Sequence, residues 1–195
     1  QAMRNAAGTE GPEITAKIRL GINEQVVEYS LPQFIETAIC SNVERLIIHA
    51  RKAILGGLSP KQNRDIPPLN YPLVHLMKKT YPDLQIILNG GITDLNTAHE
   101  QLTQVDGVMV GRAAYQNPQI LLGVDPLFYN ESAPAPSAEA ALQAYRPYVE
   151  AQLAQGFPLK HLSRHLVGLY HEVPGARRYR QILSERAHLP GADWS

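Results

Sequence analysis

Short apolar runs alternate with longer amphipathic segments over the first two thirds of the chain. Four of these runs are continuous rather than alternating, which is typical of strands buried on both faces of a sheet. They comprise residues 13–17, 45–49, 85–89 and 107–111. The segments between them predict helices at residues 32–38, 71–79 and 94–102. Alternating strands and helices form βαβ units, so the pattern predicts an α/β fold with a parallel sheet.

Polar residues stand at the ends of the four predicted strands, namely Lys17, His49, Asn89 and Arg112. Parallel strands end at one edge of a sheet, so we expect these four side chains to converge. A TIM (β/α)₈ barrel of about 250 residues has eight units of roughly 31 residues. Four units are therefore the C-terminal half of a TIM barrel, its strands 5–8. Open sheet edges are a liability, so we expect the first half to be missing from this chain.

The pattern changes after the fourth predicted strand. Residues 131–137 read Glu-Ser-Ala-Pro-Ala-Pro-Ser, which indicates a linker. Beyond it apolar residues recur at helical spacing, with a further helix expected at residues 176–186. We therefore divide the chain into a barrel half, residues 1–130, and a small all-helical domain, residues 131–195.

Composition narrows the class of protein. The 195 residues carry 18 cationic and 18 acidic side chains, so a nucleic-acid partner would need a local basic patch. The single cysteine, Cys40, excludes an internal disulfide framework and fits a reducing cytosol. No apolar run approaches the roughly 20 residues of a membrane span. We expect a cytoplasmic location and no membrane partner.

Glycines follow the third and fourth strands, in Asn89-Gly90-Gly91 and in Gly111-Arg112. Glycine lets backbone N–H groups approach an anion closely, and arginine offers a fork of donors to phosphate. In a TIM barrel the loops after strands seven and eight form the usual phosphate site. We predict a phosphate cradle here, with turn glycines and a surface arginine as the alternative.

Two basic patches indicate a polyanionic partner. Lys61 and Arg64 lie three residues apart in a long polar loop and could reach adjacent phosphates. Residues 160–186 carry six cations against two acids, and Arg177 and Arg180 share a helix face. Such patches fit an RNA backbone, although ordinary solvated surfaces are also often charged.

Other polar residues are ambiguous by sequence. Lys17 could stabilise a reduced flavin ring, but the bare sequence favours a solvated lysine at a strand end. For His49 the sequence favours a cofactor contact and a structural role equally. We expect Cys40 to be a small buried or turn residue rather than a nucleophile. The seven histidines show no metal-ligand spacing and have basic neighbours, so we expect no metal.

Several longer motifs resemble one family. They are His-Ala-Arg-Lys-Ala (49–53), Gly-Leu-Ser-Pro-Lys-Gln-Asn-Arg (57–64), Leu-Asn-Gly-Gly-Ile (88–92), Asp-Gly-Val-Met-Val-Gly-Arg-Ala-Ala-Tyr-Gln-Asn-Pro (106–118) and Pro-Gly-Ala-Arg-Arg-Tyr-Arg (174–180). From about residue 13 to the C-terminus, the chain resembles the bacterial tRNA-dihydrouridine synthases of the A type. The Ser-Pro-Lys-Gln-Asn-Arg loop and the arginine-rich helix carry most of this resemblance, because Asn-Gly-Gly and Gly-Arg occur in many flavin or phosphate barrels.

The resemblance implies a barrel that binds FMN, a helical tRNA-binding domain, and reduction of uridine to 5,6-dihydrouridine in the D-loop of tRNA. In this chemistry reduced flavin passes hydride to C6 of the uracil, a cysteine protonates C5, and NADPH regenerates the flavin. The implied cofactor contacts are Lys17, His49, Asn89, Gly90, Gly91, Gly111 and Arg112. The implied tRNA contacts are Lys61, Arg64, Arg177 and Arg180. The proton-donating cysteine belongs to the first half of the barrel, so we expect this chain alone to be inactive. We also expect the whole enzyme to be a monomer.

Two other interpretations stay open at this point. One is a different phosphate-binding barrel, either another flavin oxidoreductase or a biosynthetic lyase. The other is a non-catalytic RNA-binding module derived from a barrel.

Overall fold

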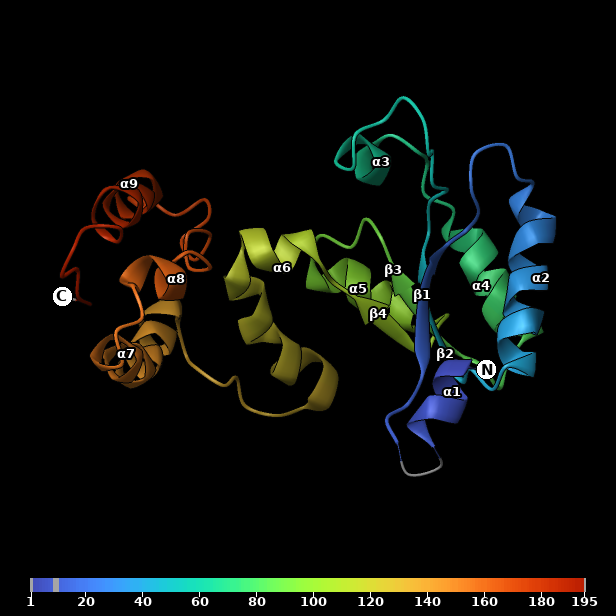
Figure 1. Ribbon diagram of the computed structural model, residues 1–195, viewed down its shortest axis with the longest axis horizontal. Helices are drawn as coiled ribbons and strands as arrows, with labels where there is room; N and C mark the ends of the chain where they lie inside the picture. Colours follow the sequence, from blue (N-terminus) through green and yellow to red (C-terminus); the bar gives the residue numbers. More distant parts are fainter. Residues whose placement is uncertain (1, 9–10, 195) are drawn as a thin grey trace. The chain divides into compact units, whose positions relative to one another are not determined.

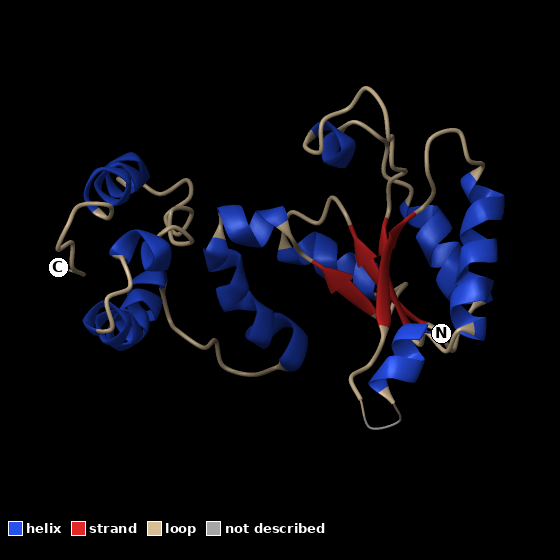
Figure 2. Ribbon diagram, viewed as in Figure 1, coloured by secondary structure: helices blue, strands red, loops and turns tan. Residues whose placement is uncertain are grey.

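The chain forms one four-stranded parallel sheet in the computed structural model, which describes residues 2–8 and 11–194. Its strands lie in sequence order as β1 (Thr15–Arg19), β2 (Arg45–His49), β3 (Gln85–Asn89) and β4 (Gly107–Met109) (Figures 1 and 2). The pairing places Arg19, His49, Asn89 and Met109 in one row at the carboxyl edge. The prediction of an α/β fold with a parallel sheet is confirmed.

Helices occupy most of the remaining chain. Before and between the strands lie α1 (Ala2–Ala7), α2 (Val27–Cys40), α3 (Gln62–Asp65), α4 (Tyr71–Thr80) and α5 (Leu95–Leu102). After β4 come α6 (Arg112–Gln116), the 3₁₀ segment η1 (Pro118–Gly123), the π-helical turn η2 (Asp125–Tyr129), α7 (Ala138–Ala154), α8 (Leu159–Ser163) and α9 (Ala176–Arg186). The ranges of β2, β3 and α9 agree with the sequence prediction.

Helix α2 begins five residues before its predicted start, and Pro32 lies inside it. Proline lacks a backbone N–H donor, so it is most common in the first turn of a helix. Val27, Leu31 and Ile35 follow one another at four-residue spacing and are all buried. Burial of this continuous apolar stripe outweighs the lost hydrogen bond and extends the helix on the N-terminal side of the proline.

The two faces of the sheet differ in burial. Leu46, Ile48, Ile86 and Leu88 are fully buried on the face covered by α2 and α4 (Figure 1). The alternate residues, such as Ile47 and His49 of β2, are only partly buried. The expectation of strands buried on both faces is therefore wrong for this chain, because the helices between the strands lie on one side and side chains alternate across a sheet.

Strand β1 begins and ends two residues later than predicted, so Lys17 is its central residue and Arg19 its last. Strand β4 ends at Met109, two residues before Gly111. The true carboxyl edge therefore carries Arg19 in place of Lys17, and Arg112 begins the next helix.

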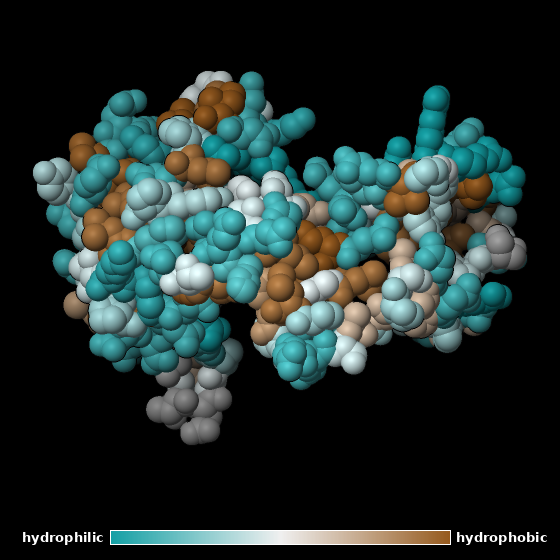
Figure 3. Space-filling model, turned by 180° about the vertical axis from the view of Figure 1, so that it is seen from behind, coloured by the Kyte–Doolittle hydropathy of each residue, from teal (hydrophilic) through white to brown (hydrophobic). Residues whose placement is uncertain are grey.

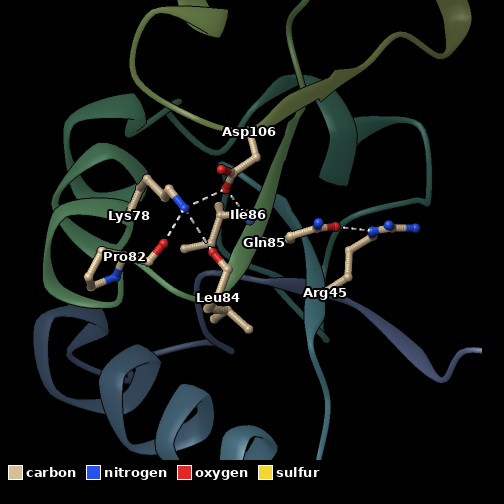
Figure 4. Close-up of polar contacts among 7 residues, drawn as sticks. All are labelled: Arg45, Lys78, Pro82, Leu84, Gln85, Ile86 and Asp106. Atoms are coloured by element: carbon tan, nitrogen blue, oxygen red, sulfur yellow. Dashed lines mark hydrogen bonds and ion pairs between the residues drawn. The ribbon is translucent and has the colours of Figure 1, made fainter.

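An ion pair at the amino edge of the sheet joins α4 to β3 and β4 (Figure 4). The Asp106 carboxylate accepts hydrogen bonds from the Ile86 backbone N–H and from Lys78 Nζ, both at 2.8 Å. Lys78 Nζ also donates to the carbonyl oxygens of Pro82 and Leu84, at 2.7 and 3.1 Å. Desolvation acts to raise the pKa of Asp106, but the hydrogen bonds and charge of Lys78 and the Ile86 N–H outweigh it. The pKa of Asp106 consequently lies below its usual range.

At the same edge, Arg45 at the start of β2 contacts Gln85 at the start of β3 and Glu13 just before β1. Arg45 Nε donates to Gln85 Oε1 at 2.8 Å (Figure 4), and Arg45 also pairs with Glu13 at 3.0 Å. Polar contacts at the amino edge thus connect neighbouring strands of the sheet.

The chain divides into two compact units. One runs up to Gly111 without Thr93–Leu95, and the other comprises Thr93–Leu95 and the residues from Arg112 onward. In the second unit Val149, Leu159 and Ala187 form a core, against which pack Tyr145, Leu153, Leu162, Ala192 and Trp194. No strand occurs in the described residues after β4. The division at residue 130 and its assignment to a barrel half and a helical domain stay predictions.

Large apolar side chains are exposed at scattered positions, among them Tyr29, Leu55 and Tyr129. On the face drawn in Figure 3, brown hydrophobic patches lie between hydrophilic residues. Scattered exposure of this kind is ordinary for protein surfaces. Of the helices in the described residues, none has the length and apolarity to cross a membrane.

Candidate functional site

A line of polar contacts links residues of β1, β3 and β4 on the sheet face away from α2 and α4. Lys17 Nζ donates to Asn89 Oδ1 at 2.8 Å, and Asn89 Nδ2 donates to the carbonyl oxygen of Met109 at 2.7 Å. The amide of Asn89 therefore uses its acceptor and one donor, which fixes its orientation. The ammonium group of Lys17 is held in place by this amide rather than by a carboxylate.

Lys17 is solvent-exposed, yet its surroundings modestly disfavour its charged form. Desolvation by burial lowers the pKa of Lys17, and the positive charge of Arg19 lowers it further. A cation in such a place would gain from a nearby anion or an electron-rich group. Because β1 continues to Arg19, Lys17 lies two residues before the carboxyl edge and stays a candidate site residue.

The loop after β3 requires glycine at two successive positions. Gly90 and Gly91 have φ angles of +101° and +73°, a region that other residues rarely adopt. A Cβ atom at Gly91 would lie 2.5 Å from a methyl carbon of Leu69 and 2.8 Å from Tyr71 Oη. Tyr71 Oη donates to the Gly90 carbonyl at 2.7 Å. This turn is therefore held in one conformation by its neighbours.

His49 ends β2 and pairs in register with Asn89. Its ring lies against Gly90, where an added Cβ would come 3.0 Å from His49 Cε1. Of the four side chains expected to converge, the structure places His49 and Asn89 in one row, and Lys17 bonds to Asn89. Their role in binding a cofactor stays a prediction.

Gly111 and Arg112 follow β4. Gly111 is exposed, and an added Cβ would meet no atom within 4 Å. Arg112 is the exposed first residue of α6 and belongs to the second unit. The structure shows no conformational need for glycine at position 111, and the phosphate role of the pair stays a prediction.

Sequence reasoning missed Arg19, which stands in the edge row where Lys17 was expected. Desolvation lowers the pKa of Arg19, and the positive charges of Arg51 and Arg64 lower it further. Lys17, Arg19, Arg51 and Arg64 therefore form a group of cations that we call the cationic cluster. Only the bounds of β1 could have revealed Arg19, because a strand that ends two residues later than predicted has Arg19 at the carboxyl edge.

The predicted RNA-binding residues are solvent-exposed. Lys61 and Arg64 lie at and within α3, and Arg177 and Arg180 lie in the first turns of α9. Helix α9 turns Tyr179 inward, where burial and then Tyr170 raise the pKa of the Tyr179 hydroxyl to about 12. Exposed cations can reach a partner, but the tRNA contacts stay predictions.

The structure offers no obvious metal centre. In residues 2–8 and 11–194 no three His, Cys, Asp or Glu side chains are grouped so as to hold a metal ion.

Comparison with known proteins now decides the family. The family described as dihydrouridine synthase (Dus) matches residues 1–192. The chain belongs to the dihydrouridine synthase family. This agrees with the resemblance inferred from the sequence motifs, and it covers both compact units.

Individual members of the dihydrouridine synthase family are similar over nearly the whole chain. The tRNA-dihydrouridine(20/20a) synthase of Shewanella oneidensis is 49% identical over 179 residues, which cover 92% of this chain and 53% of that protein. The proteins of the same name from Salmonella typhimurium and Escherichia coli K12 are each 48% identical over 181 residues. They cover 92% of this chain, and 54% and 52% of those proteins respectively. The chain spans about half the length of the curated relatives it matches.

Cys40 is the single cysteine of this chain, and the family resemblance implies that a cysteine donates a proton in the reaction. It is the last residue of α2 and is exposed, which corrects the expectation of a small buried or turn residue. Helix α2 ends where the chain turns toward the amino end of β2, whereas Lys17 and Asn89 bond across the sheet near its carboxyl edge. Cys40 is therefore at the wrong edge for chemistry beside Lys17.

Proposed function

We propose that this chain is part of an FMN-dependent tRNA-dihydrouridine synthase, in which its sheet is the second half of a TIM barrel. Membership of the dihydrouridine synthase family and the names of its relatives support the proposal. The observation that carries it is the hydrogen bond between Lys17 Nζ and Asn89 Oδ1, which holds an exposed ammonium group beside the carboxyl ends of the strands. The proposal includes a cytoplasmic, monomeric enzyme that uses NADPH.

The donor set fits a phosphorylated flavin. Cations, amides and a glycine turn line this part of the sheet, and these are groups that bind phosphate and electron-rich rings. Lys17 would approach the flavin ring, and His49 would contact the cofactor and the region of the target base. The phosphate would be bound by Asn89, Gly90, Gly91, Gly111 and Arg112. When bound, FMN supplies the reducing equivalents for the uracil ring.

The chain's own residues would act on this chemistry electrostatically. Asn89 holds the Lys17 ammonium in place, so its charge can stabilise negative charge that develops nearby. The cationic cluster adds a positive field that attracts the phosphates of tRNA. We infer that Lys61, Arg64, Arg177 and Arg180 bind the tRNA and orient its D-loop. Protonation of the uracil would need a cysteine other than Cys40.

Loss of the whole gene tests the proposed function. Mass spectrometry of tRNA from such cells should show loss of dihydrouridine in the D-loop, and the whole wild-type gene should restore it. The purified whole protein should be yellow with bound flavin. Unchanged dihydrouridine, or a colourless flavin-free product, would contradict the proposal.

Substitution of Lys17 tests the observation that carries the proposal. Lys17→Met in the whole protein should lower the rate of dihydrouridine formation by about 100-fold or more, since it removes a charge placed for the transition state. Stability should not fall much, because the Lys17 side chain is exposed and its hydrogen bond to Asn89 lies at the surface. Lys79→Met, which removes an exposed charge at the end of α4, is the matched control.

A further inference from the structure

The loop between β2 and α4 carries Lys61 and Arg64 and is fastened to the sheet edge by Arg19. Arg19 Nη1 donates to the carbonyl oxygens of Lys52 and Asn63, both at 2.8 Å. A single guanidinium nitrogen thus joins the end of β1 to the segment after β2 and to α3. These contacts link positions 33 and 44 residues apart in the chain.

The side chain of Asn63 makes a second attachment. Its Oδ1 accepts from the Ile54 backbone N–H at 2.8 Å, and its Nδ2 donates to the Ile54 carbonyl at 2.5 Å. Both ends of the amide are used, so its orientation is fixed. Asn63 lies between Lys61 and Arg64 in the chain, and it fixes this segment without adding a charge.

Polar contacts, rather than core packing, decide where this loop lies. Helix α3 has four residues, none of them buried, and a helix of this length is not stable by itself. Its start is capped reciprocally, since Ser59 N–H donates to Gln62 Oε1 at 2.9 Å and Gln62 N–H donates to Ser59 Oγ at 3.3 Å. The far end of the loop is held by Arg51, whose Nη1 donates to the carbonyl of the buried Pro67.

We propose that Arg19 and Asn63 are positioning residues that preorganise Lys61 and Arg64 as a clamp for adjacent phosphates of the tRNA backbone. This inference rests on the proposed function. A free loop would lose conformational entropy when it closed on RNA, whereas a loop already fixed at Arg19 and Asn63 loses little. The clamp therefore gains affinity from contacts within the protein that never touch the RNA.

The variant Asn63→Ala in the whole protein tests the clamp, because it removes the attachment without altering charge. We expect the dissociation constant for tRNA to rise by about tenfold through the added cost of ordering the loop. The salt dependence of binding should stay the same, since the number of phosphate contacts is unchanged. KM for tRNA should rise while kcat is retained, and amide hydrogen exchange in residues 56–66 should accelerate. Asn96→Ala, an exposed amide of α5, is the matched control.

A double-mutant cycle separates positioning from general destabilisation. Once Lys61 and Arg64 are both changed to Met, Asn63→Ala should weaken tRNA binding no further, because the residues it positions are gone. A persistent effect of Asn63→Ala in that background would overturn the inference. Arg19→Lys keeps the charge but loses the guanidinium geometry, so it should also raise the dissociation constant and accelerate exchange in the loop.

The same variants distinguish failure of this inference from failure of the proposed function. If the Lys61→Met, Arg64→Met double variant binds tRNA as tightly as wild type, the proposed tRNA contacts and the clamp are both overturned. If it binds weakly but Asn63→Ala and Arg19→Lys bind normally, the tRNA contacts stand and only the positioning role is overturned.

Discussion

A few residues near the carboxyl edge of the sheet determine the shape and charge of the candidate site. Lys17 and Asn89 form a cation–amide pair, and Gly90 lets the chain turn against the ring of His49. The next residue, Gly91, has a positive φ and leaves no space for a side chain. Each of these positions is fixed by contacts with a neighbouring strand or loop, so small changes there should have separable effects on stability and on binding.

Gly91→Ala should lower the free energy of unfolding by about 1–3 kcal/mol, because a Cβ would meet Leu69 and Tyr71 and the backbone would be strained. Urea unfolding of the whole protein measures this. Gly111→Ala is the matched control and should stay within about 0.5 kcal/mol of wild type, since that Cβ would meet open space. Equal losses for the two variants would contradict this account of the turn.

At the scale of elements, the two edges of the sheet have different tasks. The amino edge is tied together by Lys78, Asp106 and Arg45, which connect α4 with successive strands (Figure 4). The carboxyl edge instead carries the cationic cluster of Lys17, Arg19, Arg51 and Arg64. Stability contacts and candidate binding contacts are thus placed at opposite ends of the same strands.

Asp106→Asn should destabilise the protein at pH 7 by about 1 kcal/mol, because it removes a partly exposed ion pair. The pKa of Asp106 is lowered in the folded state, so its stabilising effect is present above the ordinary carboxyl pKa of about 4. That effect is lost as the pH falls through the lowered pKa. Urea unfolding as a function of pH should therefore show the two proteins converging below about pH 4.

Asp83→Asn is the matched control for this element, since Asp83 is an exposed carboxyl near the same edge. It should leave both the stability at pH 7 and its decline in acid nearly unchanged. A difference between wild type and Asp106→Asn that stays constant down to acid pH would show that the charge of Asp106 is not what stabilises this edge.

At the scale of the whole molecule, each compact unit carries its own exposed pair of cations. Lys61 and Arg64 belong to the unit that contains the sheet, and Arg177 and Arg180 belong to the unit made of α6 to α9. A tRNA is large enough to contact separate surfaces, and contacts on two units would fix its orientation as well as its affinity.

Changing Arg177 and Arg180 together to Ala should weaken tRNA binding by the whole protein and flatten its dependence on salt. Loss of two phosphate contacts reduces the slope of log K against log salt by roughly 1.5, because fewer counterions are released. Filter binding at several salt concentrations measures both quantities. Lys79→Ala removes one charge at a site without a proposed RNA contact and should change neither. Normal affinity with an unchanged slope for the double variant would exclude these arginines from the RNA interface.

The sequence by itself determined the strands β2 and β3, the helix α9, the parallel sheet and the family, because continuous apolar runs and long motifs are local signals. It also indicated Lys17, Asn89 and Gly90 as candidate site residues. Tertiary structure alone decided that β1 ends at Arg19, that one sheet face is only partly buried, and that Cys40 is exposed. These facts depend on strand register and on which helices cover which face. Both are set by contacts between residues far apart in the chain, such as the hydrogen bonds of Arg19 to Lys52 and Asn63, which no local pattern encodes.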